Sequence, residues 1–293
     1  MSAPPGYATT AGELPPAHVD ALRRLLQDRA GIALDAGKEY LVAARLGPVA
    51  RRSGLGSVAT LIELVVAGLS PYLRDAVVEA MTINETSFFR DAQAFAALRE
   101  TILPAVFERP GRIRIWCAAA ATGQEPYSVA MLIRQHFAEH ADRAEILGTD
   151  LATGPLERAA AGCYTQLEVN RGLPAPLLLR YFRRSGRDWR LNDEIRRMVR
   201  FRRLNLVGPW PAGEPFDLVL LRNVLIYFDE PTRQRVLDRT SRVLRPDGWV
   251  LLGASESTAG RHPDLVRVPS ARAMRYLPPA PSGSPLPSTR VSR

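Results

Sequence analysis

Two acidic residues follow apolar segments that are typical of buried strands. Asp150 ends the segment AEILGTD, and Glu125 comes after RIRIWCA, at the end of the loop AAATGQ. An acid after the second strand of a parallel sheet commonly accepts hydrogen bonds from ribose hydroxyls, and a carboxylate in the first turn of a helix suits the helix dipole. Taken singly, Asp150 also fits a helix cap, and Glu125 an ordinary first-turn acid.

Two later apolar segments end in a different set of polar groups. RMVRFRRLNL ends in Asn205 and Leu206, and FDLVLLRNVL contains Arg222 and Asn223, with Tyr227 soon after. A buried arginine needs a partner, so Arg222 is hard to explain by packing, whereas Tyr227 on its own would be a core residue. Because ligands bind at the carboxyl ends of the strands in such sheets, these positions and the two acids predict a site for a nucleoside.

The loop after RIRIWCA limits what that nucleoside can carry. It has one glycine, Gly123, so it matches neither GxGxxG nor the GK[ST] of a P-loop. The tight phosphate cradle of dinucleotide enzymes is therefore not expected, although the small residues 118–121 let a ligand approach the backbone closely. The prediction is a nucleoside without a polyphosphate.

The stretch NETSFFRD joins two helix-like segments and combines apolar with hydrogen-bonding residues. A buried joint would favour apolar residues throughout, and a free linker would not need two phenylalanines. We expect Phe88 and Phe89 to anchor this joint so that Asn84, Thr86 and Arg90 face a ligand.

The elements that must position these residues fall into two parts. Residues 16–82 read as helix throughout, and two of the segments, SVATLIELVVAG and PYLRDAVVEAMT, begin with Ser or Pro as helices often do. Pro48 is expected to break or kink the helix before them. No catalytic constellation occurs there, so we predict a helical domain for contact or docking.

After residue 83, short apolar strands alternate with helices, which predicts an α/β fold with a parallel sheet covered on both faces. The final 16 residues contain five prolines and four serines and are expected to be disordered. The predicted divisions are a helical domain (13–82), a ligand-binding domain (83–277) with a small basic β-subdomain near 183–203, and the tail (278–293).

Composition excludes several classes of protein. No apolar run reaches the roughly 18 residues that a membrane span needs, and the first residues lack the features of a signal peptide. We therefore expect a cytoplasmic protein without membrane insertion, and a monomer by default. Cys117 and Cys163 form neither a CxxC pair nor a zinc spacing, and no metal site is predicted.

The net charge of +9 is concentrated in one segment of the chain. Residues 180–203 hold ten arginines against three acidic residues, a net of +7, whereas residues 1–80 are balanced. A local basic patch of this kind favours an acidic partner, which could be a carboxylate-rich protein surface, a nucleic acid or a membrane face.

Five stretches, in family order, resemble the chemotaxis receptor methyltransferases of the CheR type: NETSFFRD, WCAAAATGQEPYS, GTDLATGPLERAAAGCY, FDLVLLRNVLIYFD and LRPDGWVLLGASES. The resemblance runs from about residue 15 to residue 277. It implies a helical domain followed by a Rossmann-like class I methyltransferase domain, with S-adenosylmethionine as cofactor. It also implies methyl transfer to glutamate side chains on the cytoplasmic helices of methyl-accepting chemoreceptors.

The resemblance also implies roles for matching residues. Arg90 and Tyr227 would lie near the transferred methyl group as catalytic residues, and Asp150 would bind the ribose. The implied cofactor-binding residues are Asn84, Thr86, Arg90, Glu125, Asp150, Asn205, Leu206, Arg222 and Asn223. A glutamate carboxylate is already ionised at neutral pH, and the sulfonium is a built-in leaving group, so neither a general base nor a metal is required.

Two departures from the family pattern affect what is expected. Gln124 stands where the family commonly has Glu, and the segment between Tyr181 and Asn205 looks shorter than in members that bind a tethering peptide of the receptor. That segment lacks the glycine-rich turn expected for such binding. We therefore predict no strong binding of a receptor tether, and direct contact of the basic segment with acidic receptor surface.

Two other functions use the same fold. A nucleic-acid methyltransferase would suit the basic segment, but the chain has no [DNS]PP[YF] loop and neither cysteine follows a proline. A regulatory module that binds S-adenosylmethionine without turnover is the second alternative, and retention of Arg90, Asp150, Asn223 and Tyr227 argues against it.

Overall fold

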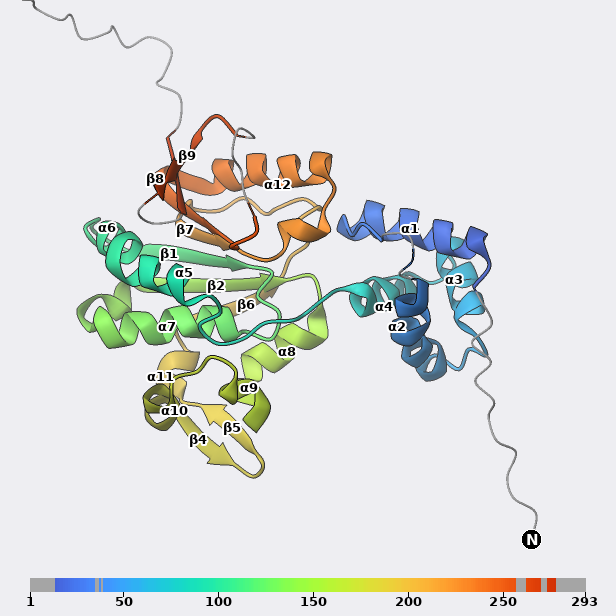
Figure 1. Cartoon of the computed structure of the whole chain (residues 1–293), viewed down its shortest axis with the longest axis horizontal. Coiled ribbons are helices and arrows are strands. Elements are labelled where there is room, and N and C mark those ends of the chain that lie inside the picture. The colour runs from blue at the N-terminus through green and yellow to red at the C-terminus, as the bar shows by residue number, and fades with distance from the viewer. Residues whose placement is uncertain (1–13, 35–36, 38, 257–261, 270–272, 278–293) are drawn as a thin grey trace, which may run out of the picture.

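In the computed structural model, the described residues are 14–34, 37, 39–256, 262–269 and 273–277. The predicted tail, and the start of the predicted helical domain at residue 13, lie outside them. The helical part is a bundle of four helices at one end of the molecule (Figure 1): α1 (Pro16–Ala30), α2 (Glu39–Arg52), α3 (Val58–Val66) and α4 (Pro71–Met81). The bundle has its own core, in which Leu26, Leu46 and Leu61 are fully buried.

Local sequence signals account for the bounds of these helices. Ser57 and Ser70 cap α3 and α4 by accepting hydrogen bonds from the backbone N–H groups of Thr60 and Leu73. The expected break at Pro48 is wrong, because α2 continues through this residue to Arg52. Proline removes one helical hydrogen bond, and burial of Leu46 and Val49 on either side favours an unbroken helix.

The second part is built on a seven-stranded sheet with the order β6-β2-β1-β7-β8-β10-β9. The first five strands in this order are parallel, and β10 and β9 extend one edge in antiparallel fashion. The strands are β1 (Ile113–Ala118), β2 (Ala144–Asp150), β6 (Val199–Arg203), β7 (Phe216–Leu221), β8 (Leu244–Leu252), β9 (Leu265–Val268) and β10 (Ala273–Tyr276). The prediction of a parallel sheet is confirmed, with a two-strand antiparallel extension.

Helices cover both faces of this sheet, as predicted. Successive residues of a strand point to opposite faces, so Ile115 and Cys117 of β1 pack on the side of α7, whereas Trp116 packs on the side of α12. Figure 1 shows α12 on one side of the sheet and α7 on the other. The helices of this part are α5 (Ala92–Ala97), α6 (Leu103–Phe107), α7 (Gln124–His136), α8 (Thr153–Ala161) and α12 (Glu230–Val243), with a π-helical segment η1 (Leu98–Ile102) and 3-10 segments η2 (Ala138–Arg143) and η3 (Leu225–Tyr227).

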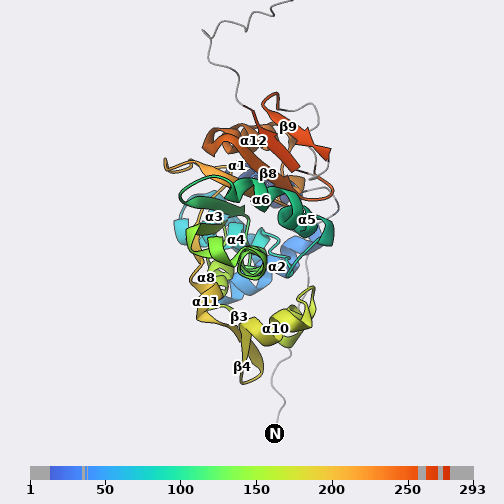
Figure 2. The same cartoon turned by 90° about the vertical axis from the view of Figure 1, so that its left-hand side faces the viewer.

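A small subdomain projects from the sheet on the side away from α12 (Figure 2). Its antiparallel sheet has the order β3-β5-β4, and it includes three short helices. The elements are β3 (Cys163–Tyr164), α9 (Gln166–Asn170), α10 (Ala175–Tyr181), β4 (Phe182–Ser185), β5 (Asp188–Leu191) and α11 (Asp193–Arg196). The bounds expected near 183–203 therefore need correction, since the small sheet begins at Cys163 and β6 belongs to the main sheet.

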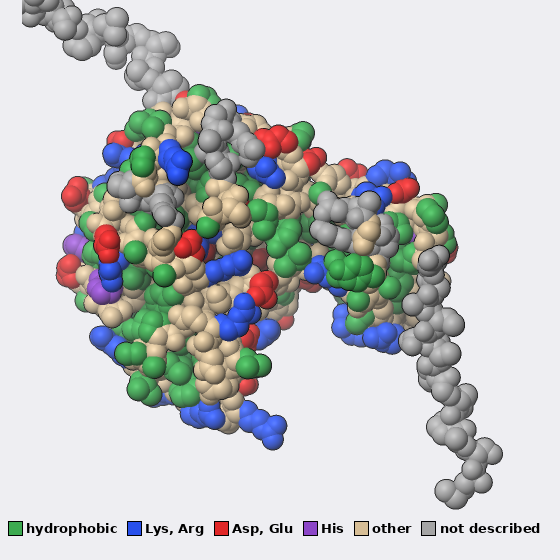
Figure 3. Space-filling model, viewed as in Figure 1, with side chains coloured by type: hydrophobic (Ala, Val, Ile, Leu, Met, Phe, Trp, Pro, Cys, Tyr) green, Lys and Arg blue, Asp and Glu red, His purple; other side chains and the backbone are tan. Residues whose placement is uncertain are grey.

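The basic residues of this subdomain lie at its surface. Arg183, Arg184, Arg187 and Arg190 are exposed, and basic side chains are visible at the tip of the subdomain in Figure 3. The same view shows a recess between the subdomain and the helical bundle. Within the described ranges, no helix is both long and apolar enough to cross a membrane.

Candidate functional site

All ten residues that the sequence singled out as site residues line one cavity. They are Asn84, Thr86, Arg90, Glu125, Asp150, Asn205, Leu206, Arg222, Asn223 and Tyr227. The cavity lies at the carboxyl ends of β1, β2, β6 and β7, where the chain direction of a parallel sheet brings successive loops together. The segment that joins the two parts of the chain supplies a further wall.

The loop after β1 holds a conformation that leaves its backbone open to the cavity. Ala119 and Ala121 have φ angles of 56° and 48°, in the left-handed region. Gly123 follows with φ 89°, and a Cβ at this position would approach the side chain of Ala159 to 2.8 Å. Glycine is therefore required there, while the small side chains before it give a ligand access to main-chain groups.

Asp150 fixes this loop from the end of β2. Its Oδ2 accepts a hydrogen bond from the backbone N–H of Ala121 at 2.8 Å, and its Oδ1 accepts one from Ala152 at 3.0 Å. Burial raises the pKa of this carboxyl, although the backbone N–H groups act in the opposite direction. Each carboxylate oxygen can accept more than one hydrogen bond, so Asp150 keeps acceptor capacity for two hydroxyl groups.

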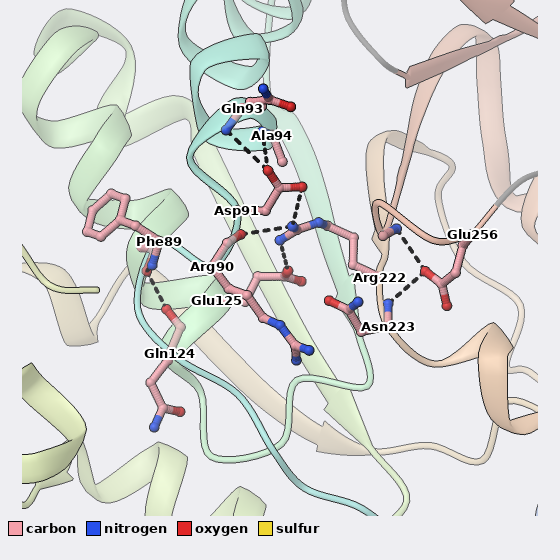
Figure 4. A network of polar contacts seen from close by, with 12 residues as sticks. Phe89, Arg90, Asp91, Gln93, Ala94, Gln124, Glu125, Arg222, Asn223 and Glu256 are labelled. Atoms are coloured by element: carbon pink, nitrogen blue, oxygen red, sulfur yellow. Dashed lines mark hydrogen bonds and ion pairs between the residues drawn. The ribbon is translucent and has the colours of Figure 1, made fainter. Parts of the chain in front are cut away.

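Arg222 links three parts of the site (Figure 4). Its side chain is only 1% exposed, and its Nη1 donates to Glu125 Oε2 at 2.7 Å. Its Nη2 donates to the carbonyl oxygen of Arg90 at 2.8 Å and lies 3.6 Å from Asp91 Oδ2. Arg222 lines the cavity as predicted, but its guanidinium is engaged by protein groups, so its geometry suits positioning of the site more than direct contact with a ligand.

Burial dominates the electrostatics of Glu125. Desolvation raises the pKa of this carboxyl from its ordinary value of 4.5, and the opposing effect of Arg222 does not cancel the shift. The Glu125 side chain keeps 12% of its surface exposed. A cationic group that entered the cavity would therefore meet a carboxylate with little competing water.

The NETSFFRD stretch is anchored by its phenylalanines, as the sequence predicted. Phe88 is fully buried and makes edge-to-face contacts with Tyr164 and Phe182, with ring centroids 5.0 and 5.7 Å apart. Phe89 adopts φ 48°, and its backbone N–H donates to Ser128 Oγ at 3.0 Å. These contacts hold the preceding polar residues against the cavity.

The polar residues of this stretch contact protein groups both near to them and distant from them in the sequence. The amide of Asn84 donates to Thr82 Oγ1 at 3.0 Å, and Arg90 Nη1 donates to the carbonyl oxygen of Glu85 at 3.1 Å. The Glu85 carboxylate pairs with Arg171, and this hydrogen bond lowers the pKa of Glu85. The guanidinium of Arg90 thus lies along the cavity wall, on the opposite side of the segment from the phenylalanine anchor.

Residues of the helical bundle form part of the cavity, which the sequence did not predict. Ala30, Ile32 and Met81 line it beside the sheet loops. Asn205 contacts the same bundle, because its Nδ2 donates to the carbonyl oxygen of Arg29 at 2.6 Å. The backbone carbonyl of Tyr227 accepts from Ala33 N–H at 3.0 Å, and Ile32 and Phe228 form an isolated antiparallel bridge.

Two kinds of position in or beside the cavity were missed from the sequence. The apolar bundle residues look like core positions, and no local pattern distinguishes a core leucine or methionine from one that faces a ligand. Glu256 was also missed, although its motif GASES follows an apolar strand as the other site motifs do. That position relative to β8 was the available signal.

The chemical groups that line the cavity fit S-adenosylmethionine. Asp150 offers acceptors for the ribose hydroxyls, Glu125 offers a carboxylate for the ammonium group, and the small side chains of the β1 loop leave room for close approach. Ile32, Leu151 and Leu204 supply apolar surface for a base. Over the described part of the chain, no three His, Cys, Asp or Glu residues cluster as metal ligands would.

Comparison with known proteins agrees with this site. Residues 17–82 match the family model for the all-alpha domain of CheR methyltransferase, and residues 84–274 match the model for its SAM binding domain. "Chemotaxis protein methyltransferase" of Vibrio parahaemolyticus is 40% identical over 242 residues, which cover 81% of this chain and 88% of the relative. "Chemotaxis protein methyltransferase 1" of Pseudomonas aeruginosa is 38% identical over 248 residues, covering 82% and 90%.

A more distant relative extends the same comparison. "Probable chemotaxis protein methyltransferase" of Rhizobium etli is 34% identical over 244 residues, covering 80% of this chain and 91% of the relative. Both family models lie in the order that the fold requires, with the helical bundle before the sheet. With its Rossmann-like sheet and a cavity suited to S-adenosylmethionine, the chain belongs to the CheR family of S-adenosylmethionine-dependent methyltransferases of chemotaxis.

Proposed function

We propose that this enzyme transfers a methyl group from S-adenosylmethionine to glutamate side chains of chemoreceptor helices and forms glutamate methyl esters. The names of its relatives support an acceptor in chemotaxis. The observation that carries the proposal is the state of the carboxylates in the cavity. Glu85 is paired with Arg171, Glu125 with Arg222, and Asp150 with two backbone N–H groups.

This arrangement leaves no evident general base among the described residues, since none of those that line the cavity is a histidine or a cysteine. An amine or hydroxyl acceptor must lose a proton during methyl transfer, so it benefits from such a base. A glutamate acceptor does not, because its carboxylate is ionised at neutral pH. An ionised carboxylate is therefore the acceptor that suits this cavity best.

The reaction is a single displacement. Bound S-adenosylmethionine supplies a methyl group on a positively charged sulfur, which makes the methyl carbon electrophilic and gives a neutral thioether as the leaving group. An acceptor oxygen would form its bond to the methyl carbon as the carbon–sulfur bond breaks, and the bonding pair would stay with sulfur. No proton moves, so the enzyme must align three atoms and exclude water, and positioning of this kind supplies on the order of 7–11 kcal/mol.

Named residues would share this positioning. Asp150 would hold the ribose hydroxyls, and Glu125, oriented by Arg222, would hold the ammonium group. Arg90 and Tyr227 approach the cavity from different segments of the chain, the joint between the domains and the turn after β7. We propose that Arg90 steers the acceptor carboxylate and that the Tyr227 hydroxyl orients one of its oxygens.

The proposal is tested with cofactor labelled in its methyl group. The enzyme is incubated with membranes that contain the receptors of the same organism, and the labelled protein is then treated with mild base. The expected result is label on a receptor-sized band that base releases as volatile methanol, because esters hydrolyse under these conditions. Base-stable label would show transfer to nitrogen or carbon and would overturn the proposed acceptor.

A further inference from the structure

The Glu256 carboxylate does not line the cavity but accepts hydrogen bonds from four backbone N–H groups. Figure 4 shows it beside Asn223. Its Oε1 accepts from Val224 and Leu225 at 2.8 and 2.7 Å. Its Oε2 accepts from Asn223 at 2.7 Å and from Gly253 at 2.8 Å. One side chain thus joins the turn after β7 to the turn after β8.

The turn that Glu256 holds has a backbone conformation that needs support. Asn223 has φ 57°, a left-handed conformation that costs free energy in most non-glycine residues. The turn also aligns the N–H groups of three successive residues toward one point, and each of them would lack a partner without the carboxylate. The negative charge makes these hydrogen bonds stronger than neutral ones.

The residues on this turn face the ligand. Asn223, Val224 and Tyr227 line the cavity, whereas Glu256 does not. Asn223 and Glu256 also pack closely against Gly253, in the turn after β8. A Cβ at Gly253 would lie 2.6 Å from Glu256 Oε2 and 2.8 Å from Asn223 Nδ2. The position of the Asn223 side chain is therefore fixed by contacts from β8 as well as by its own strand.

We propose that Glu256 is a positioning residue for cofactor binding and methyl transfer. It holds the turn in the conformation that directs Asn223 to the cofactor and Tyr227 to the acceptor. The inference rests on the proposed roles of these two residues. Binding of the product S-adenosylhomocysteine tests the role of Asn223 in cofactor binding, and it requires no methyl acceptor. This test therefore remains valid even if the proposed glutamate acceptor is wrong.

The substitution Glu256→Gln tests this with little change in shape. The glutamine oxygen can serve one pair of N–H groups, while its NH₂ group faces the other pair, donor against donor. We expect the full-length variant to bind S-adenosylhomocysteine about tenfold more weakly by calorimetry, from the loss of charge-assisted hydrogen bonds. Glu108→Gln changes an exposed carboxylate far from the cavity and is the matched control.

Gly253→Ala perturbs the same turn from the opposite side and does not change charge. We expect it to weaken binding in the same way, because the added methyl group displaces Glu256 or Asn223. Gly213→Ala is its control, since a Cβ at Gly213 meets nothing within 4 Å. If Glu256→Gln fails to fold, Gly253→Ala decides the question by the same measurement.

Two readouts separate positioning from a general loss of stability. Binding is measured at a temperature where circular dichroism shows that the parent protein and the variant are both fully folded. If Glu256 only stabilised the fold, its substitution would lower the melting temperature and leave the affinity for S-adenosylhomocysteine unchanged. Asn223→Ala is then combined with Glu256→Gln, and the two losses should be clearly less than additive because Glu256 acts through Asn223. Affinity within about twofold of the parent for the folded variant, or fully additive losses, would overturn the inference.

Discussion

At the scale of single residues, burial and hydrogen-bond partners have opposite effects on the pKa values of the carboxyl groups in the site. Glu125 accepts a hydrogen bond from the Arg222 guanidinium at 2.7 Å, yet its pKa is raised. The reason is that removal of the carboxylate from water destabilises its charged form by more than the attraction to Arg222 stabilises it. Asp150 shows the same direction for the same first cause. Both carboxyl groups therefore lose their charge at a higher pH than carboxyl groups of ordinary pKa would.

This leads to a prediction about pH. Protonation of Glu125 removes the charge that would bind the ammonium group, so affinity for S-adenosylhomocysteine should fall as pH decreases, and the fall should begin at a higher pH than for a carboxyl of ordinary pKa. Calorimetry at a series of pH values should show a weaker dependence for Glu125→Gln, in which only the contribution of Asp150 remains. Parallel curves for the two proteins would contradict the proposed role of Glu125.

The stability of the ligand-free protein should respond in the opposite sense. A carboxyl whose pKa is raised on folding binds its proton more tightly in the folded state. Its contribution to the free energy of unfolding is therefore present below the ordinary pKa of 4.5 and is lost as pH rises through the raised value. Acid should therefore weaken the proposed binding of the ammonium group at Glu125 and, in the ligand-free protein, remove the free-energy cost of burying this charge.

The identities of the cavity residues could be predicted from the sequence, whereas their partners could not. Most of the predicted residues follow an apolar strand, and chain direction in a parallel sheet brings those strand ends together, whereas Asn84, Thr86 and Arg90 lie in the joint before the sheet. Arg222 and Glu125 are 97 residues apart, and Asn205 and Arg29 are 176 apart. No local pattern encodes such pairs, so the sequence could not show that these polar groups are engaged by the protein itself.

At the scale of elements, the joint between the two parts of the chain depends on one aromatic anchor. Phe88 is fully buried against Tyr164 and Phe182, both of which belong to the small subdomain. The subdomain therefore helps to hold the segment that carries Asn84 and Arg90, in addition to presenting its basic surface.

Phe88→Ala should destabilise the protein by about 3–5 kcal/mol, because the vacated space lies among well-packed rings. The free energy of unfolding from urea titration measures this loss. Leu167→Ala in the same subdomain is the control, since Leu167 is 77% exposed and surface changes usually stay within about 0.5 kcal/mol. Equal losses for the two variants would show that Phe88 is not the anchor.

Strands with continuous apolar runs were predicted well, but the sequence did not show which sheet each edge strand joins. The segment 144–150 matches β2 at both ends, because a strand buried between neighbours carries a strong pattern. β6 and β4 are instead arginine-rich edge strands, and their composition does not reveal which sheet each one joins. Pairing to β2 or to β5 is decided by tertiary contacts that the local sequence does not encode.

At the scale of the whole molecule, the helical bundle forms part of the cavity wall. The bundle and the sheet domain are joined by hydrogen bonds from Gln27 to Asp229 and from Asn205 to the Arg29 carbonyl. An ion pair between Arg203 and Asp75, 3.3 Å apart, lies beside them. A docking role for the bundle stays a prediction, but its apolar residues already complete the cavity.

Cofactor binding should therefore couple the two domains. A ligand at about 100 times its Kd stabilises the bound state by about 2.7 kcal/mol. Local openings that break the cavity should therefore become up to about 100 times rarer. Hydrogen exchange should slow on addition of S-adenosylhomocysteine in peptides that cover residues 27–33 and 79–91, as well as in β2. Helix α3 does not line the cavity and is the internal control. Protection confined to the sheet domain would mean that the bundle closes the cavity without contributing to binding, and Asn205→Ala should then leave the exchange pattern unchanged.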